Sequence, residues 1–263
     1  MILHDQHVHS CFSHDSKELI DNYYNKAKEL GCKYFITTEH IDFDVHPNHE
    51  DWTADFEKLK KRLSELYKSG GPIPLLGVEI GYRADFRPKM EKWINSQDFD
   101  VINLSIHNNP LMEYYYESFF REYGIDKCLE MYFNQMMDAM LSMDDFDVLA
   151  HIDYGFKTAY NIDKDLKFSD YEHYLIPILK QLIKKDKALE INTKVQKAFP
   201  DTHLKYLLGL YKSLQGTKLT LSSDAHIIDR YMEGFDKYKQ IIKDCGFDHL
   251  CYFVKRKCYN FDI

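Results

Sequence analysis

Short apolar segments alternate with longer amphipathic segments along nearly the whole chain. The apolar segments are rich in β-branched residues, as buried strands are, and the segments between them have helical spacing of apolar residues. Seven strands are predicted over Ile2–Val8, Tyr34–Thr38, Pro74–Ile80, Val101–Ile106, Phe146–His151, Ala188–Asn192 and Lys218–Ser222. Helices are predicted over Lys17–Leu30, Asp51–Ser69, Lys89–Ser96, Ile125–Met143, Tyr171–Lys184, His203–Leu214 and Tyr231–Cys245. Successive strand–helix units of this kind predict an α/β protein with a parallel sheet.

The number of strand–helix units indicates whether the parallel sheet is open or closes into a barrel. Seven or eight consecutive units favour a closed barrel, although the pattern alone also allows an open doubly wound sheet. No glycine-rich phosphate or dinucleotide loop follows any predicted strand. No linker rich in Pro, Gly or Ser divides the 263 residues, so we expect a single domain over 1–263. An aromatic segment, Leu250–Val254, is expected to close the sheet or pack at an edge.

The net charge and the apolar content of the chain limit the kinds of partner it can have. The formal charge of −8 argues against a nucleic-acid partner, while bound cations would still permit a small anionic substrate. No stretch approaches the roughly 18 apolar residues of a membrane span, and the first ten residues do not resemble a signal peptide. We therefore expect a cytoplasmic protein without membrane contact, whose oligomeric state the sequence leaves open.

The placement of the histidines carries most of the functional information. Six of the thirteen stand within or just after the end of a predicted strand: His7, His9, His40, His107, His151 and His226. Glu79 and Asp224 occupy the same kind of position. Any one of these histidines taken singly is more often an ordinary hydrogen-bonded residue than a ligand. In a parallel barrel, however, all strands end on one face, so the set is expected to share one pocket.

These residue types in this number predict metal binding. Neutral imidazoles and carboxylates bind zinc, iron or manganese, and a carboxylate can bridge two ions. His7 and His9, at alternate positions of an extended segment, would point to the same side. Six imidazoles and several carboxylates exceed the needs of one ion, so two or three divalent metal ions are expected.

Six short motifs, in order along the chain, resemble those of the PHP (polymerase and histidinol phosphatase) family. They are His7-Val8-His9-Ser10, Thr37-Thr38-Glu39-His40, Gly77-Val78-Glu79, Ser105-Ile106-His107, Ala150-His151 and Ser222-Ser223-Asp224-Ala225-His226. The stretch from Phe12 to Ser16 is most similar to the stand-alone histidinol-phosphatase branch. The resemblance implies a distorted (β/α)7 TIM-like barrel that hydrolyses L-histidinol phosphate to L-histidinol and phosphate in histidine biosynthesis.

The resemblance also implies how the ligands are shared. A first metal would be held by His7, His9, Glu79 and Asp224, and a second by Glu79, His107 and His151. A third would be held by Asp15, His40 and His226, with His14 as the alternative to Asp15. A carboxylate is the harder oxygen ligand and is therefore preferred over the imidazole at that position.

Hydrolysis of a phosphate monoester by metal-activated water needs no protein nucleophile. Catalytic roles are expected for Asp15, His226 and Asp224. The proton for the leaving alkoxide could come from His226, from Asp15 or from a metal-bound water. Lys157, Arg83 and Arg230 are the candidate phosphate-binding cations. Asp42, Asp44 and Asp153 are candidate partners of the substrate ammonium group.

Two other functions remain open at this stage. One is a phosphoesterase that acts on a nucleotide or on the 3′ end of a nucleic acid. The other is a metal-binding regulatory domain without catalytic activity. The partly unfilled coordination expected for each ion favours catalysis over a structural role.

Overall fold

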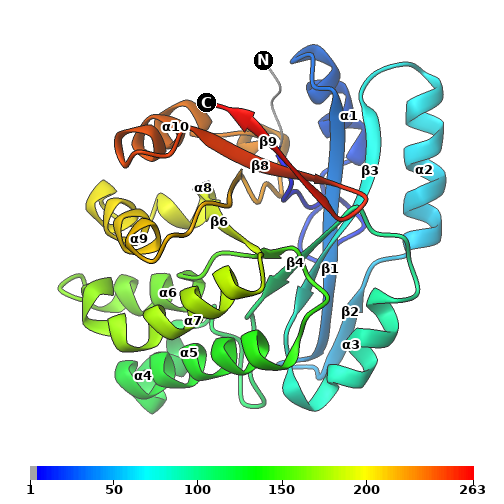
Figure 1. Cartoon of the computed structure of the whole chain (residues 1–263). Helices are drawn as coiled ribbons and strands as arrows, with labels where there is room; N and C mark the ends of the chain where they lie inside the picture. Colours follow the sequence, from blue (N-terminus) through cyan, green and yellow to red (C-terminus); the bar gives the residue numbers. More distant parts are fainter. Residues whose placement is uncertain (1–4) are drawn as a thin grey trace.

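A mostly parallel sheet forms the centre of the protein, and helices surround it (Figure 1). The computed structural model describes residues 5–263. Its strands are β1 (Tyr34–Val45), β2 (Glu50–Thr53), β3 (Ile73–Gly81), β4 (Val101–Ser105), β5 (Val148–Leu149), β6 (Ala188–Asn192), β7 (Leu219–Ser222), β8 (His249–Val254) and β9 (Lys257–Asp262). The main sheet has the order β2-β1-β3-β4-β5-β6-β7, and all its pairs are parallel except β2 with β1.

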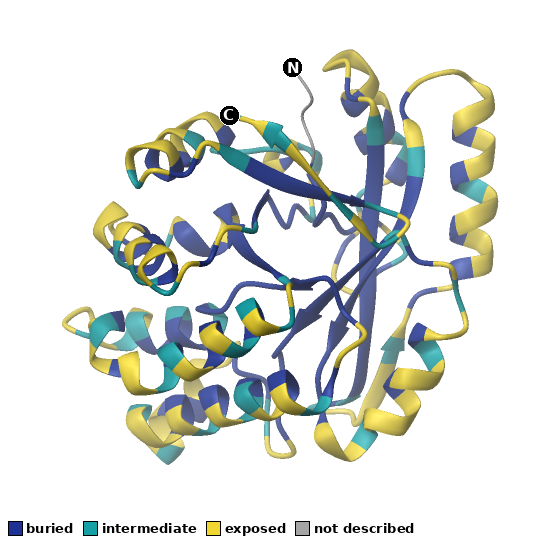
Figure 2. Ribbon diagram, in the orientation of Figure 1, coloured by how far each residue is buried: buried dark blue, intermediate teal, exposed yellow. Residues whose placement is uncertain are grey.

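The helices bury one face each against this sheet, and their outer faces are exposed (Figure 2). They are α1 (Ile20–Glu29), α2 (Phe56–Lys68), α3 (Arg87–Ile94), α4 (Glu117–Tyr123), α5 (Ile125–Ser142), α6 (Tyr154–Ile162), α7 (Glu172–Lys184), α8 (Thr193–Gln196), α9 (Asp201–Ser213) and α10 (Phe235–Asp244), with short 3-10 helices at Ala84–Phe86, Phe168–Tyr171 and Ile228–Arg230. None of the described helices has the length and apolar character that a membrane span requires.

The segment around Val8 joins the two sides of the sheet. The amide of Thr38 on β1 donates to the carbonyl of Val8 at 2.9 Å, and the amide of His9 donates to the carbonyl of Ala225, beyond β7, at the same distance. The segment thus occupies the seventh position of a distorted barrel with six parallel strands. The prediction of a regular strand over 2–8 is wrong for residues 5–8, where the segment forms an isolated bridge to Ala225, and its first three residues lie outside the described part.

The largest local difference from the prediction concerns β1. It continues to Val45 instead of ending at Thr38, and β2 replaces the expected first turn of the helix over 51–69. Polar residues beyond Thr38 resemble a loop in sequence, yet Glu39, His40 and Asp42 are buried. The strand persists because these polar side chains bind one another inside the barrel mouth. Helices α4, α6 and α8 were not predicted.

The hairpin of β8 and β9 covers the amino ends of the parallel strands. Phe253 on β8 packs with Ile36, Leu75 and Val101, which lie near the starts of three of those strands. The predicted segment Leu250–Val254 therefore belongs to a separate two-stranded sheet. With the amino end covered, the carboxyl ends of the strands form the other mouth of the barrel, where the candidate ligands lie.

Candidate metal centre

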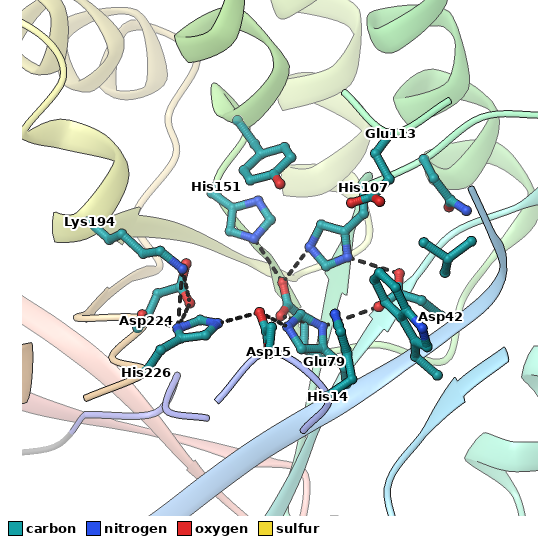
Figure 3. Close-up of a pocket in the computed structure, with 15 residues that line it drawn as sticks. His14, Asp15, Asp42, Glu79, His107, Glu113, His151, Lys194, Asp224 and His226 are labelled. Carbon is teal, nitrogen blue, oxygen red and sulfur yellow. Dashed lines mark hydrogen bonds and ion pairs between the residues drawn. The ribbon is translucent and has the colours of Figure 1, made fainter. Parts of the chain in front are cut away.

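The predicted ligands converge at the carboxyl ends of the strands. Each comes from β1, β3 or a segment that follows a strand, apart from those of the amino-terminal segment that completes the barrel. Seven of the nine line one pocket, shown in Figure 3: Asp15, His40, Glu79, His107, His151, Asp224 and His226. The other two, His7 and His9, are fully buried and lie within 4 Å of Glu79 and Asp224.

Glu79 lies at the centre of this cluster. Its Oε1 is 3.0 Å from Nε2 of His107 and 2.8 Å from Nε2 of His151. Its Oε2 is 3.1 Å from Nε2 of His7 and 3.2 Å from Nε2 of His9. Oε2 also lies 3.3 Å from Nδ1 of His40. The two oxygens thus face different imidazoles, as expected of a carboxylate shared between two cations.

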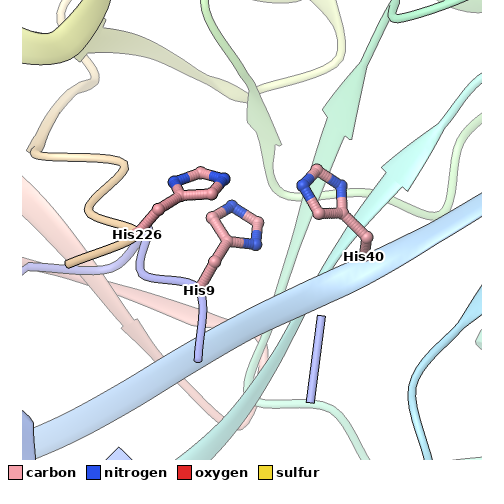
Figure 4. A group of neighbouring side chains, drawn as sticks. All are labelled: His9, His40 and His226. Carbon is pink, nitrogen blue, oxygen red and sulfur yellow. The ribbon is translucent and has the colours of Figure 1, made fainter. Parts of the chain in front are cut away.

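A third group of ligand atoms lies at the pocket entrance. Nε2 of His226 donates to Oδ2 of Asp15 at 2.7 Å, and Nε2 of His40 is 3.5 Å from the same oxygen. Figure 4 shows the rings of His9, His40 and His226 side by side, and ligand atoms of these three lie within 4.8 Å of one another. His14 lines the same pocket but stacks on Trp52, with 3.4 Å between ring centroids. Asp15 therefore lies among the ring nitrogens, whereas His14 lies to one side.

The hydrogen bonding of the buried imidazole nitrogens shows whether these residues suit divalent cations. Nε2 of His7 and Nε2 of His9 are buried and have no hydrogen-bond partner, although both lie beside carboxylates. Buried polar atoms without partners are uncommon in folded proteins. Lone pairs of imidazole nitrogens directed at a cation would account for both atoms, so the residues present suit metal binding.

The second nitrogen of several candidate ligands is held by a buried group. Nδ1 of His7 donates to Oε1 of Glu190 at 2.6 Å, and Oε2 of Glu190 accepts from the amide of His151 at 2.8 Å. Nδ1 of His9 is 3.3 Å from the hydroxyl of Ser13, which donates to Glu39 at 2.5 Å. Such contacts fix the ring orientation and leave Nε2 free for a cation. The sequence analysis assigned no role to Glu190, although a charged residue inside the predicted apolar strand Ala188–Asn192 is a signal for such a role.

The carboxylates strongly affect the protonation of the rings. Burial alone lowers the pKa of His107, but Asp42 and Glu79 outweigh it and raise that pKa to about 10. Burial also opposes protonation of His7, whose pKa is nevertheless raised by Glu190 and Glu79. The pKa of Glu79 is lowered despite its burial, because His7 and His107 lie beside it. Protons therefore compete with cations for these nitrogens.

Two of the candidate ligands have an unusual backbone. Asp224 has φ of 51° and His151 has φ of 21°, a region that residues other than glycine seldom adopt. Each stands two residues after the end of a strand, β5 or β7, and both side chains line the pocket. Backbone strain of this kind is concentrated at functional sites, where surrounding contacts maintain it.

The three predicted phosphate-binding cations lie outside the pocket wall. Arg83 is buried, and its guanidinium binds Asp85 at 2.7 Å and Asp44 at 3.4 Å. Arg230 is exposed and binds Glu233. Lys157 lies on α6 with its Nζ 4.8 Å from the ring centroid of Tyr154, which does line the pocket.

Lys194 is the one lysine or arginine in the pocket wall among residues 5–263. Its Nζ donates to Oδ1 of Asp224 at 3.3 Å and lies 3.2 Å from Nδ1 of His226 (Figure 3). It was missed in the sequence, although it follows the end of β6 as the candidate ligands follow other strands. The side chain of Asn192 caps the short helix α8 and so fixes the turn that carries Lys194.

The opposite wall of the pocket carries two buried acceptors. Oε1 of Glu113 and Oδ1 of Asn108 are buried without a hydrogen-bond partner, and both residues line the pocket. Burial, the largest influence, raises the pKa of Glu113 to about 7. Neither residue was predicted, because the loop between β4 and α4 has no motif that distinguishes them. Of the predicted ammonium partners, Asp44 binds Arg83, and Asp153 accepts from His203 and Gln196 away from the pocket.

Comparison with known proteins gives consistent matches over the whole chain. A family model described as the PHP domain matches residues 5–194. A histidinol-phosphatase of Lactococcus lactis is 30% identical over 261 residues, which cover 96% of this chain and 95% of the relative. A probable histidinol-phosphatase of Clostridium acetobutylicum is 29% identical over 255 residues, covering 96% of this chain and 97% of the relative. A crystal structure of the L. lactis histidinol phosphate phosphatase, complexed with zinc, L-histidinol and phosphate, aligns with a TM-score of 0.86 at 28% identity, covering 97% of this chain and 98% of that one.

Proposed function

Because the chain belongs to the PHP domain family, we propose that it is a metal-dependent histidinol-phosphatase, which hydrolyses L-histidinol phosphate to L-histidinol and phosphate. The relatives that carry this name match the chain from end to end. The related crystal structure, with zinc, L-histidinol and phosphate, has the same fold. The activity is that of a phosphoric monoester hydrolase in histidine biosynthesis.

The observation that carries the proposal is the position of Glu79 between two pairs of imidazoles. The first metal would be held by His7, His9, Glu79 and Asp224, the second by Glu79, His107 and His151, and the third by Asp15, His40 and His226. Divalent zinc, manganese or iron at these places would lower the pKa of water and neutralise the charge of a phosphoryl group. Several unfilled coordination positions distinguish this arrangement from a structural site.

Side chains of the pocket would bind and orient the phosphate and would donate a proton to the leaving alkoxide oxygen. Lys194, beside Asp224 and His226, brings a positive charge to the pocket wall, so we assign it a phosphate-binding role ahead of Lys157. Asp15 holds Nε2 of His226 at 2.7 Å. This pair is placed at the entrance, where either member could pass a proton to the leaving alkoxide oxygen. Arg83 and Arg230 do not line the pocket and are bound to acidic residues, so we assign neither of them a phosphate contact.

The wall opposite Lys194 suits the amino-alcohol part of the substrate. Glu113 and Asn108 each offer a buried oxygen without a partner, and Trp52 and Tyr154 add aromatic surface to the same pocket. An ammonium group would satisfy both acceptors, and an imidazole ring would pack against the aromatic side chains. A phosphate monoester without an amine would leave the acceptors unpaired.

A phosphate-release assay tests the proposal. The protein would be loaded in turn with zinc, manganese and iron, and offered L-histidinol phosphate, a nucleoside 3′,5′-bisphosphate or single-stranded DNA. We expect kcat/KM for L-histidinol phosphate to exceed that of the other two by about 100-fold or more, because only this substrate satisfies the buried acceptors. Efficient cleavage of the bisphosphate or the DNA alone would overturn the proposal. Glu79→Gln, with its fold checked by circular dichroism, should lose metal and activity together.

We also propose that residues 1–263 act as a single PHP domain in the cytoplasm. One hydrophobic core cluster includes residues from Val8 to Leu250, which supports one cooperative unit. A charged phosphate ester does not cross a lipid bilayer unaided, so the enzyme has to share the compartment in which its substrate forms. Fractionation of cells should recover the activity with the cytoplasmic fraction.

A further inference from the structure

Asp42, on β1, faces two candidate metal ligands with its two oxygens. Its Oδ1 accepts from Nδ1 of His107 at 2.9 Å, and its Oδ2 lies 3.2 Å from Nδ1 of His40. His107 belongs to the second proposed metal position and His40 to the third. One carboxylate therefore contacts a ligand of each of two neighbouring positions.

These contacts determine which ring nitrogen can bind a cation. An ionised carboxylate only accepts hydrogen bonds, so Nδ1 of His107, which donates to Oδ1 of Asp42, carries the hydrogen. Nδ1 of His40 faces two carboxylate oxygens, Oδ2 of Asp42 at 3.2 Å and Oε2 of Glu79 at 3.3 Å, and both favour a hydrogen on that nitrogen. In the neutral ring this leaves the lone pair on Nε2. Nε2 of His107 faces Glu79 at 3.0 Å, and Nε2 of His40 faces Asp15 at 3.5 Å. Both lone pairs thus point at the atoms that would share a cation with them.

Gly81 provides the space for this arrangement. A Cβ atom at Gly81 would lie 1.8 Å from Oδ1 of Asp42 and 3.4 Å from Nδ1 of His107. Its φ lies outside the left-handed region, so the backbone does not require glycine there. The pairing of β1 with β3 brings Gly81 next to Asp42, since His40 pairs with Glu79 and Ile41 with Ile80. A side chain at this position would push Asp42 off the histidine.

Two other roles for Asp42 fit the structure less well. It could ligate a cation with His40 and His107, whose ligand atoms lie within 4.8 Å of its own. The hydrogen bond to Nδ1 of His107 instead occupies the nitrogen that such a site would need. It could bind the substrate ammonium, as the sequence suggested, but the residue is 2% exposed and both oxygens face imidazoles.

We propose that Asp42 is a positioning residue that fixes the tautomers of His40 and His107 and so couples occupancy of the second and third metal positions, with Gly81 keeping the space open. The inference rests on the ligand assignment made under the proposed function. Asp42 itself would bind no metal, but its contacts with both histidines would set the metal affinity of the second and third positions together. Contacts of this kind typically change metal affinity by about 10- to 100-fold.

The test compares Asp42→Asn, Gly81→Ala and the double variant with the wild type. Asp44→Asn is the matched control, because Asp44 lies on the same strand but binds Arg83 and His49. Zinc content would be measured by mass spectrometry after dialysis at a series of free zinc concentrations. Asp42→Asn should weaken two positions by about 10- to 100-fold and leave the position of His7, His9 and Asp224 filled. The double variant should lose no more than Asp42→Asn alone, since Gly81 acts only through Asp42.

A second readout separates positioning from loss of fold. In zinc-loaded wild type, nitrogen NMR of the rings should show His40 and His107 with a slowly exchanging hydrogen on Nδ1, and Asp42→Asn should lose this feature. Equal zinc affinity in wild type and Asp42→Asn, or equal loss at all three positions, would overturn the inference. If the wild type itself binds no zinc in the pocket, the ligand assignment fails, and with it the proposed function.

Discussion

Several of the candidate histidine ligands have a neighbour that contacts their other ring nitrogen. Glu190 holds His7, Ser13 lies beside His9 and Asp42 holds His107, all from inside the barrel mouth. The convergence of the candidate ligands could be predicted from sequence, because histidines and acids at the ends of parallel strands meet on one face. The residues that contact their second ring nitrogens could not be predicted, because those contacts depend on which strands lie beside one another.

Glu113 gives a prediction about substrate binding at the residue scale. Glu113→Gln should raise KM for L-histidinol phosphate by about 10- to 100-fold, because an amide lacks the charge that binds an ammonium group. An aryl phosphate without an amine serves as the matched substrate, and its KM should change less than about twofold. Equal effects on the two substrates would assign Glu113 to the reaction centre rather than to amine binding.

The same residue predicts a pH dependence. Burial raises the pKa of Glu113 to about 7, so the carboxylate is charged above that pH and neutral below it. KM of the wild type should therefore rise as the pH falls through 7, whereas KM of Glu113→Gln should lack this change. Metal content has to be measured at each pH, because protonation of the imidazoles also releases metal at low pH. Identical pH profiles of the two proteins would contradict the assignment.

At the scale of elements, hydrophobic periodicity predicted the order of the strands and helices. It did not predict the residues at which they begin and end. The strands predicted from Pro74 to Ser222 correspond to β3 through β7, and the helices α5, α7 and α9 lie close to their predicted ranges. The extension of β1 to Val45 escaped prediction because its polar residues are buried only through their partners on other strands. Hydrophobic periodicity predicts an element only where its buried face packs against an apolar core. The mouth of the barrel is buried but lined by polar residues, so periodicity does not reveal the strand there.

The hairpin of β8 and β9 leads to a stability prediction. Phe253→Ala should lower the free energy of unfolding by about 3 to 5 kcal/mol, because Phe253 is 4% exposed and packs on the strand starts. Urea denaturation measures the change, and Leu141→Ala, at a side chain 60% exposed, is the control, with an expected change within about 0.5 kcal/mol. Zinc affinity of Phe253→Ala should stay unchanged, since the hairpin lies at the far end of the barrel. A loss of zinc together with stability would mean that the two ends are coupled.

At the scale of the whole molecule, the amino-terminal segment brings distant parts of the chain together. Val8 connects β1 to the segment after β7, and this places His7 and His9 between Glu79 and Asp224. The metal centre therefore joins the first part of the chain to its last parallel strand. Bound metal should stabilise the closed barrel, because the ligands are separated in the unfolded chain.

Metal removal should accordingly lower the thermal stability. Zinc at about 100 times its dissociation constant contributes about 2.7 kcal/mol per site, which corresponds to a shift in Tm on the order of 5–10 °C for a domain of this size. Differential scanning calorimetry with and without a chelator measures the shift, and added zinc should reverse it. Glu79→Gln, which keeps only the proposed third position intact, should show a smaller response to the chelator than the wild type. An unchanged Tm in the wild type would argue against metals that join the two ends of the barrel.

Anomalous X-ray diffraction from zinc-loaded crystals of the protein, recorded at the zinc absorption edge, would show whether Glu79 is shared between two metal ions. We expect three peaks in the pocket, two of them flanking Glu79 and the third among Asp15, His40 and His226, each about 2.0–2.3 Å from its ligand atoms. Peaks remote from Glu79, or a single peak whose ligands exclude it, would contradict the proposed metal centre.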